Sequence, residues 1–249
     1  MSFRVIKIGG SNLDDPSWLG RFARVLVSTP GKLILVHGGA QAITDVQRDR
    51  GIPVTISGGV RVTPPEVAEI AVHVLCGAVR TAILDALRGV GLDPVGIAGL
   101  DGFLDVELID EVRLGRVGRV VGVDTAALEA LVHRGKVPVL APVSLGPDGA
   151  VVNVNSDQVA AAVAHELPAA ELLLVTNVPG VFRNGRLLAE VTPSDVRALA
   201  VEGSVSAGMT EKLVAALHAG PARVRIGDIE VLTSSSAGTL VLGADAVAS

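Results

Sequence analysis

The sequence predicts an α/β fold built on a mainly parallel sheet. Short apolar runs alternate along the chain with stretches of helical spacing, and two of these runs, at 5–8 and 33–36, each lead into a glycine pair and then a helix-compatible stretch. Continuous aliphatic runs of this length are typical of strands that are buried on both faces. Because parallel strands end on the same edge of a sheet, we expect the two glycine turns to open on one pocket.

The composition fits one large domain or two closely joined lobes. The chain has 249 residues, of which 49% are hydrophobic and 19% are charged, so a substantial core can form. A net charge of −5 without a basic run argues against a nucleic-acid partner, and an aromatic content of 2% argues against base stacking. A small anionic substrate would have to be met by a local cluster of cations.

Cysteine usage and hydropathy indicate a cytoplasmic protein. The single cysteine, Cys76, cannot form an intramolecular disulfide, and its apolar helical surroundings predict a buried, unreactive thiol. No Cys or His spacing indicates a zinc site. The N-terminal apolar run is too short for a signal peptide, and no uninterrupted apolar stretch reaches membrane-spanning length. We therefore expect neither a metal site nor a membrane partner.

The other elements of the N-terminal part follow from the same patterns. Helical spacing predicts helices over 18–27, from 41, from 65 to about 87 and from 124, and apolar runs predict strands over 54–56, 95–99 and 137–142. The prolines at 64 and 65, followed by Glu66, suit the start of the third of these helices. The glycine-containing segment 113–123 is predicted to be a hairpin that forms a weakly basic surface arm.

Residues 5–10, Val-Ile-Lys-Ile-Gly-Gly, form a candidate anion site. Lys7 has no apolar role at the end of a buried strand, and Gly9 and Gly10 leave backbone N–H groups accessible. Taken alone, the segment is also consistent with a strand-end lysine whose ammonium reaches solvent beside an ordinary turn. The recurrence of the glycine turn at Gly38 and Gly39 favours the anion site.

A second polar cluster lies where a strand is expected to give way to a helix. Ser156 or Asp157 could serve as the helix N-cap. One cap needs only one such residue, however, and Asn153, Asn155 and Asp157 alternate as on an extended segment, so that their side chains would point the same way. We therefore interpret this cluster as functional.

A second lobe is expected from residue 168. A strand over 171–175 leads into a polar loop over 176–181, and a helix over 194–199 precedes a small-residue loop over 202–209. The next helix is predicted to begin at Thr210 and to carry Lys212 in its first turn, where a lysine opposes the helix dipole unless an acidic or phosphorylated group lies nearby. A glycine loop, a helix N-terminus and a lysine favour phosphate binding, although the Walker spacing is absent.

Six motifs follow one another over nearly the whole chain. They are Val5-Ile6-Lys7-Ile8-Gly9-Gly10, Val36-His37-Gly38-Gly39, Gly59-Val60-Arg61-Val62-Thr63, Asn153-Val154-Asn155-Ser156-Asp157, Thr176-Asn177-Val178-Pro179-Gly180-Val181, and Gly208-Met209 with Lys212. In their order and spacing they resemble the amino acid kinase family. The resemblance implies a three-layer αβα sandwich with a mainly parallel central sheet and two lobes. It also implies that residues 1–167 bind an amino-acid substrate and form a homodimer, and that residues 168–249 bind ATP.

Within this family, the motifs most resemble enzymes that use ATP to phosphorylate the γ-carboxylate of N-acetyl-L-glutamate in arginine biosynthesis. A carboxylate acceptor is ionised at neutral pH, because its reference pKa is about 4.3, so the reaction needs no general base. It needs positioning and neutralisation of charge on the transferred phosphoryl group. The resemblance assigns this neutralisation to Lys7 and Lys212, with Asp157 holding both ammonium groups and backbone N–H groups around Gly10 as further donors.

The resemblance also implies the binding residues. Arg61 would hold the α-carboxylate of the acceptor, Asn153 its carboxylate and amide end, and Gly38 and Gly39 would donate N–H groups to the migrating phosphoryl group. The nucleotide would lie along a set of residues that comprises Gly9, Thr176, Asn177, Val178, Pro179, Gly180, Val181, Ser204, Val205, Ser206, Gly208 and Met209. Mg²⁺ would be held mainly by the nucleotide phosphates, without a protein metal ligand.

Several positions depart from the usual pattern of the family. Ala40 replaces a third glycine and narrows the approach of an acetyl group, Arg80-Thr81 replaces an asparagine-lysine pair, and the region 227–236 is shorter than expected. The chain begins a few residues before Val5, without the N-terminal helix of arginine-inhibited hexamers. We therefore expect a dimer that is insensitive to arginine.

One alternative is the lysine-pathway relative that phosphorylates α-aminoadipate or glutamate carried on a small acidic protein. Cys76-Gly77 and residues 99–102 favour this alternative, whereas Arg61 within its motif favours free acetylglutamate. A carrier protein would need a basic collar around the mouth of the site. The arginines that could provide one are Arg113, Arg116 and Arg119.

A further alternative, from another class, is a nucleotide-sensing domain that binds without turnover. Such a domain usually loses a charge from the reacting set. Lys7, Asp157 and Lys212 are all intact in this chain, which argues against it.

Overall fold

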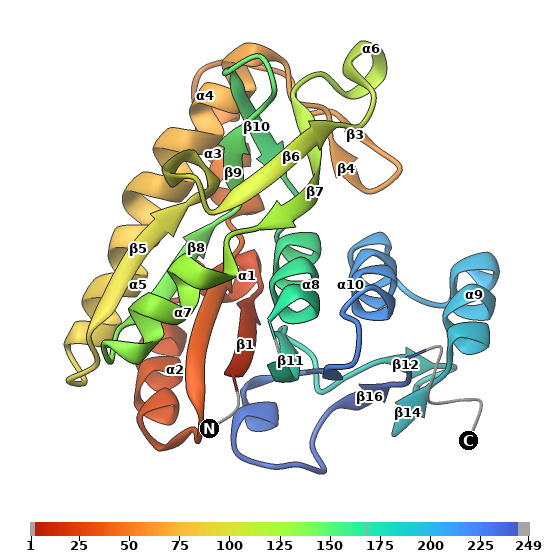
Figure 1. Cartoon of the computed structure of the whole chain (residues 1–249). Helices are drawn as coiled ribbons and strands as arrows, with labels where there is room; N and C mark the ends of the chain where they lie inside the picture. The colour runs from red at the N-terminus through yellow and green to blue at the C-terminus, as the bar shows by residue number, and fades with distance from the viewer. Residues whose placement is uncertain (1–2, 168, 244–249) are drawn as a thin grey trace.

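The computed structural model describes residues 3–167 and 169–243, and its centre is an eight-stranded sheet (Figure 1). In the order in which they lie side by side, the strands are β14 (Glu190–Val191), β16 (Thr239–Val241), β15 (Arg223–Gly227), β11 (Ala169–Val175), β1 (Phe3–Ile8), β2 (Lys32–His37), β8 (Val137–Ala141) and β5 (Pro94–Ala98). Every neighbouring pair is parallel except β15 and β16. The predicted mainly parallel sheet is therefore confirmed.

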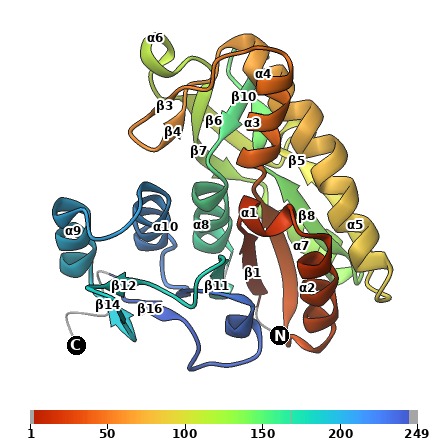
Figure 2. The same cartoon turned by 180° about the vertical axis from the view of Figure 1, so that it is seen from behind.

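Helices cover both faces of this sheet, as Figures 1 and 2 show from opposite sides. Val5, Ile34 and Val36 pack against one helical layer, which contains α7 (Thr125–His133), α8 (Ser156–Glu166), α9 (Pro193–Glu202) and α10 (Ala207–Leu217). Ile6 and Ile8 pack against the other, which contains α2 (Pro16–Ser28) and α5 (Arg80–Arg88). Because successive side chains of a strand point to opposite faces, each apolar strand contributes side chains to the packing against both helical layers. The three-layer αβα architecture is confirmed.

A four-stranded sheet lies above the N-terminal half of the main sheet (Figure 1). Its order is β6 (Leu104–Leu108), β7 (Val117–Val123), β10 (Val151–Val154) and β9 (Val143–Leu145). The hairpin predicted over 113–123 is wrong in its bounds, because β6 and β7 are its arms and Arg113 lies in the short helix α6 (Glu111–Leu114) between them. Asp110 starts α6 by accepting a hydrogen bond from the backbone of Arg113.

The remaining elements of the N-terminal half surround the carboxyl end of the main sheet. They are α1 (Gly10–Leu13), α3 (Ala40–Asp49), β3 (Ile56–Ser57), β4 (Val60–Arg61), α4 (Pro65–Val72), the π-helical η1 (His73–Val79) and the 3₁₀ turn η2 (Gly99–Asp101). β3 and β4 pair as a small antiparallel hairpin. Its turn uses Gly58 and Gly59, both at positive φ.

Segments α4, η1 and α5 run from Pro65 to Arg88 as two helical stretches joined by a kink at Gly77, whose backbone angles are not helical. By the length and composition of the whole segment it could cross a membrane, although no uninterrupted apolar run in the sequence predicts this. A core helix of a soluble protein meets the same criterion, and Ile70, Leu75 and Ile83 are buried within the fold. Cys76, predicted to be buried, is only partly buried; burial still raises the pKa of its thiol.

The C-terminal half completes the main sheet rather than standing apart from it, since β1 pairs with both β2 and β11. It contains β12 (Phe182–Arg183), β13 (Arg186–Leu187) and the 3₁₀ turn η3 (Ile229–Leu232), besides the strands and helices already given. The predicted lobe boundary follows α8, next to residue 168, which lies outside the described residues.

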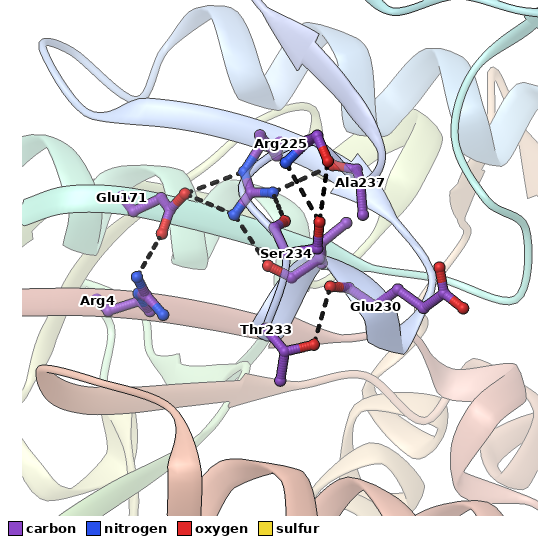
Figure 3. Close-up of polar contacts among 9 residues, drawn as sticks. Arg4, Glu171, Arg225, Glu230, Thr233, Ser234 and Ala237 are labelled. Carbon is purple, nitrogen blue, oxygen red and sulfur yellow. Dashed lines mark hydrogen bonds and ion pairs between the residues drawn. The ribbon is translucent and has the colours of Figure 1, made fainter.

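A buried arginine holds the segment after β15 in place (Figure 3). The Arg225 guanidinium donates to Glu171 Oε1 at 2.8 and 3.0 Å, and to the carbonyl oxygens of Val231, Ser234 and Ala237. Glu171 also pairs with Arg4 at 2.9 Å, so one carboxylate joins β1, β11 and β15. These bonds fold the segment back onto the face of the sheet that packs against α2, where Val231 and Leu232 join Leu173 and Val175.

Candidate active site

The two glycine turns predicted to share a pocket lie against each other. Ile8 and His37 are register partners at the ends of β1 and β2, and the Gly38 N–H donates to Ile8 O at 3.0 Å. A Cβ added at Gly10 would lie 3.1 Å from Gly39 N and 3.2 Å from Ala40 N. Among the described residues, the N–H groups of Gly10, Gly39 and Ala40 donate to no other backbone group, so they remain available to an anion.

Three charged side chains converge beside these turns. Lys7 Nζ lies 2.9 Å from Asp157 Oδ1, and Lys212 Nζ lies 3.3 Å from Asp157 Oδ2. Lys7 points to the side of β1 that packs on α8, as Val5 does, while Asp157 comes from the first turn of α8 and Lys212 from α10. Lys7 and Asp157 are only 3% and 5% exposed, so this ion pair has little contact with bulk water. The predicted convergence of these three residues is present.

Burial and mutual attraction set the ionisation of this cluster. Burial lowers the pKa of Lys7 to about 8, although the neighbouring Asp157 raises it. Burial opposes ionisation of Asp157, but the two ammonium groups outweigh it and lower the pKa of this carboxyl. At neutral pH the cluster therefore carries two positive charges and one negative charge, which leaves net attraction for a phosphoryl group.

The strand-to-helix junction differs in detail from the prediction. Asn155, and not Ser156 or Asp157, is the N-cap of α8, because its Oδ1 accepts from the N–H groups of Asp157 (2.8 Å) and Gln158 (3.3 Å). The alternation expected from Asn153 to Asp157 ends with β10 at Val154. The side chain of Asp157 is thereby free of capping and turns toward the lysines.

A cavity of about 270 Å³ extends from the lysines to the β3–β4 hairpin. The predicted residues that line it are Lys7, Gly10, Gly38, Gly39, Ala40, Arg61, Asn153, Asp157, Gly208 and Lys212. Its apolar walls come from Ile43, Ile56, Val60, Leu75, Val117, Pro142 and Val154. Cationic groups at two places with apolar walls between them suit a short aliphatic molecule that carries two carboxylates.

A larger cavity of about 380 Å³ lies between β7, α8 and α10. None of the residues predicted for the site lines it, and its walls are mainly valine and alanine. Size therefore does not identify the reacting site in this protein, whereas the charge cluster and the glycine turns do.

Arg61, on β4, lines the smaller cavity together with the two lysines. Its guanidinium donates to Ala40 O at 2.8 Å, to Thr44 Oγ1 at 2.7 Å and to Gln47 Oε1. No carboxylate within the described residues pairs with it, and burial lowers its pKa. A buried guanidinium with only neutral partners favours an incoming carboxylate. Asn153 lines the same cavity and donates to Thr63 Oγ1 at 3.3 Å.

Most residues predicted to bind the nucleotide lie outside this cavity. Gly9, the loop 176–181, Ser204, Val205, Ser206 and Met209 do not line it, and Gly208 does. Val181 is fully buried, and its N–H donates to Thr239 Oγ1 at 2.8 Å, so this residue anchors the loop. The loop follows the end of β11, whose register neighbour β1 carries Lys7.

The helix that carries Lys212 starts earlier than predicted. Ser206 is its N-cap and accepts from the Met209 N–H at 3.3 Å, so α10 begins at Ala207 and not at Thr210. Lys212 therefore lies in the second turn, and not in the first turn as predicted. The opposition between the lysine and the helix dipole is weaker there, and Asp157 supplies the acidic partner.

Of the three arginines considered for a basic collar, Arg113 remains exposed on α6, 4.0 Å from Asp110, whereas Arg116 and Arg119 are engaged elsewhere. Arg116 is 5% exposed and binds Asp148 at 2.7 and 2.9 Å, beneath the turn before β10. Arg119 pairs with Glu107 at 2.9 Å across the β6–β7 hairpin. Arg116 is thus a structural tie, and the charge of Arg119 is already balanced.

Three polar residues that line the reacting cavity, Asn155, Ser156 and Glu211, are absent from the site residues predicted from the sequence. Asn155 and Ser156 belong to the polar cluster interpreted as functional, but the sequence assigns them no binding or catalytic role. Glu211 precedes Lys212 directly, and a carboxylate beside a predicted phosphate-binding lysine is the feature that could have identified it.

Comparison with known proteins agrees with this geometry. A model of the amino acid kinase family matches residues 2–228. The chain belongs to the amino acid kinase family. Acetylglutamate kinase of Chloroflexus aurantiacus is 43% identical to this amino acid kinase over 89% of the chain and 90% of its own length. Acetylglutamate kinase of Methanopyrus kandleri is 39% identical over 95% and 99%.

Solved structures share the fold of this amino acid kinase. A Streptococcus mutans protein superposes with a TM-score of 0.83 at 28% identity, covering 96% of this chain and 98% of its own. Carbamate kinase from Giardia lamblia bound to AMP-PNP superposes with a TM-score of 0.73 at 16% identity, covering 97% and 98%. At that identity the second likeness shows the fold alone.

Proposed function

We propose that this amino acid kinase is an acetylglutamate kinase. It transfers the γ-phosphoryl group of ATP to the γ-carboxylate of N-acetyl-L-glutamate and forms N-acetyl-L-glutamyl 5-phosphate and ADP, a step of arginine biosynthesis. The names of the relatives that match about nine-tenths of the chain support this assignment. The observation that carries it is the convergence of Lys7, Asp157 and Lys212 beside the glycine turns.

The proposed chemistry is an in-line displacement at phosphorus. A γ-carboxylate oxygen of the acceptor attacks the γ-phosphorus, and the bond from this phosphorus to the oxygen that bridges to the β-phosphate breaks. The acceptor is already ionised, so no residue takes its proton. Lys7 and Lys212 neutralise charge on the moving phosphoryl group, Asp157 holds both ammonium groups, and the N–H groups near Gly10 and Gly39 stabilise the equatorial oxygens.

The acceptor would lie between the lysines and the β3–β4 hairpin. Arg61 receives the α-carboxylate in a two-oxygen contact, in place of part of its bonding to Thr44 and Gln47. Asn153 binds the amide end. The apolar walls of the cavity contact the methylene groups and the acetyl methyl, next to Ala40.

The donor would be ATP with Mg²⁺, bound on the side of α10 and the loop 176–181. No group of three or more His, Cys, Asp or Glu side chains that could hold a metal occurs in the part of the chain that the structure describes. Asp157 is engaged by two lysines, so the phosphate oxygens and water are the fitting ligands for this cation. When bound, Mg²⁺ supplies further neutralisation of phosphate charge.

A free acceptor is favoured over a carrier-linked one. Of the arginines proposed for a basic collar, Arg116 is buried and Arg119 is paired with Glu107, which leaves Arg113 as the exposed member of the three. One exposed arginine offers little electrostatic attraction to a small acidic carrier.

A cytoplasmic homodimer remains part of the proposal. Light scattering coupled to size exclusion is expected to give twice the 25.3 kDa chain mass; a monomer or hexamer mass would refute the dimer.

An acceptor panel tests the proposed activity. ADP release is measured with N-acetylglutamate, glutamate, N-acetylaspartate and N-acetyl-aminoadipate in parallel, with Lys212→Ala as the inactive control. The proposal expects turnover mainly with N-acetylglutamate and little with the others. Turnover only with a protein-linked acceptor would establish the carrier alternative, and nucleotide binding without turnover of any acceptor would establish the sensing alternative.

A further inference from the structure

Glu211 occupies an unusual place for an acid. It lies on α10, directly before Lys212, and lines the cavity assigned to two anionic substrates. Within the described residues it forms no ion pair with a lysine or arginine. Burial, and then the negative charge of Asp157, raise the pKa of its carboxyl. The surroundings of Glu211 therefore disfavour ionisation of its carboxyl. A role for this residue has to be sought in the contacts of its side chain.

The first contact leads to the helix that carries Asp157. Asn155 Nδ2 donates to Glu211 Oε2 at 3.4 Å. The Oδ1 atom of the same amide accepts from the Asp157 N–H at 2.8 Å and caps α8. One planar side chain thus joins Glu211 to the backbone of the residue that holds both lysines.

The side chain of Glu211 also faces the acceptor-binding hairpin, because Glu211 and Gly59 line the same cavity. The Oε1 atom of Glu211 lies 3.3 Å from the position that a Cβ would occupy on Gly59, and its Cγ lies 3.4 Å from it. Gly59 is in the turn between β3 and β4, and Arg61 follows two residues later on β4. The side chain of Glu211 therefore lies between the turn that leads to Arg61 and the cap that orients Asp157.

We propose that Glu211 is a positioning residue that connects the acceptor-binding β3–β4 hairpin to the N-cap of α8, and so couples acceptor binding at Arg61 to the placement of Asp157. This inference rests on the proposed acceptor site. The coupling works through contact and not through charge, so the amide isostere keeps it and a methyl group does not.

Steady-state kinetics of Glu211→Ala and Glu211→Gln test the proposal. Loss of the contact in Glu211→Ala is expected to raise the KM for N-acetylglutamate about tenfold, the value of roughly one hydrogen bond, and to lower kcat by a smaller factor through Asp157, with the KM for ATP within about threefold of the parent. Glu211→Gln is expected to stay within about threefold in all three constants. Glu166→Ala removes an exposed carboxylate from the far end of α8 and is the matched control, without expected effect.

A second readout separates positioning from a merely structural role. Hydrogen–deuterium exchange of residues 56–61 is expected to slow when N-acetylglutamate is added to the parent and to Glu211→Gln, and to change less in Glu211→Ala. An unchanged acceptor KM in Glu211→Ala, or equal changes in the KM for ATP and for the acceptor, would overturn the proposal. If the parent itself fails to phosphorylate N-acetylglutamate, the proposed function fails instead, so the two failures are distinguishable.

Discussion

Lys7 and Lys212 bind different oxygens of the same carboxylate. Lys7 Nζ lies 2.9 Å from Asp157 Oδ1, and Lys212 Nζ lies 3.3 Å from Asp157 Oδ2. The two lysines come from the first strand and from a late helix, so the carboxylate between them fixes their separation. Removing that carboxylate would leave the two ammonium groups close together in a poorly solvated site, without a negative charge between them.

Asp157→Asn therefore affects both activity and stability. The amide keeps the shape but not the charge, so the ammonium groups lose their common partner. We expect kcat for N-acetylglutamate to fall at least about 10²-fold, and the free energy of unfolding to fall by about 3 kcal/mol, as when one member of a buried ion pair is removed. Urea denaturation measures the second effect. An Asp157→Asn variant as stable and as active as the parent would contradict the assigned role.

The pH dependence of activity reports on Lys7. Burial lowers the pKa of this ammonium to about 8 in the free protein, and the protonated form is the one that neutralises phosphate. The value of kcat/KM for ATP is therefore expected to fall as pH rises through about 8. Bound phosphate raises the pKa of Lys7, so the same fall in kcat should occur at higher pH. A profile of kcat/KM that stays flat to about pH 10 would be inconsistent with this account.

Gly10→Ala tests the role of the backbone N–H groups. The new methyl would lie 3.1 Å from Gly39 N and 3.2 Å from Ala40 N, where it covers the donors proposed for the phosphoryl oxygens. We expect kcat to fall about 10²-fold, as for loss of an oxyanion donor, while circular dichroism shows an intact fold. The matched control is Gly20→Ala in α2, where a methyl meets only Arg24 at 3.7 Å. If both alanines leave kcat unchanged, the donor role is wrong.

Arg61→Ala tests the acceptor site. Loss of a two-oxygen charged contact is expected to raise the KM for N-acetylglutamate about 10²-fold, with the KM for ATP within about threefold of the parent. Arg61→Lys keeps the positive charge but cannot bind both carboxylate oxygens at once, so the KM for N-acetylglutamate should rise less than in Arg61→Ala. Arg61 also ties the hairpin to α3 through Thr44 and Gln47. If that tie were its sole role, both KM values would change together and the free energy of unfolding would drop.

The sequence was sufficient for the central strands of the sheet, because they are buried on both faces and form continuous apolar runs, as at Ile34, Leu35 and Val36; it did not predict the strands β14, β15 and β16 on the C-terminal side. Helix starts were less predictable. Several neighbouring residues at each start have side chains that could cap a helix. Asn155 and Ser206 are the actual N-caps because the preceding strand or loop ends there. Which of these residues becomes the N-cap depends on the tertiary fold.

The parts of the site that the sequence did not predict depend on contacts between residues far apart in the chain. Arg116 is buried because Asp148, 32 residues away, meets its guanidinium, and nothing in the local pattern of 113–123 indicates this partner. Lys7, Asp157 and Lys212 could be grouped because their motifs resemble a family in order and spacing. Glu211 belongs to none of these motifs; its place directly before Lys212 is a weak sequence signal, and its neighbours Gly59 and Asn155 become apparent only in the folded chain.

A double-mutant cycle on Lys7 and Lys212 tests the central claim most directly. We would measure kcat for N-acetylglutamate phosphorylation in Lys7→Ala, Lys212→Ala and the double variant, with folding checked by circular dichroism. Each single change is expected to lower kcat at least about 10²-fold, and the double variant is expected to lose less than the product of the two, because both ammonium groups act on one phosphoryl group. A folded single variant whose kcat stays within about threefold of the parent, or two losses that multiply in full, would contradict it.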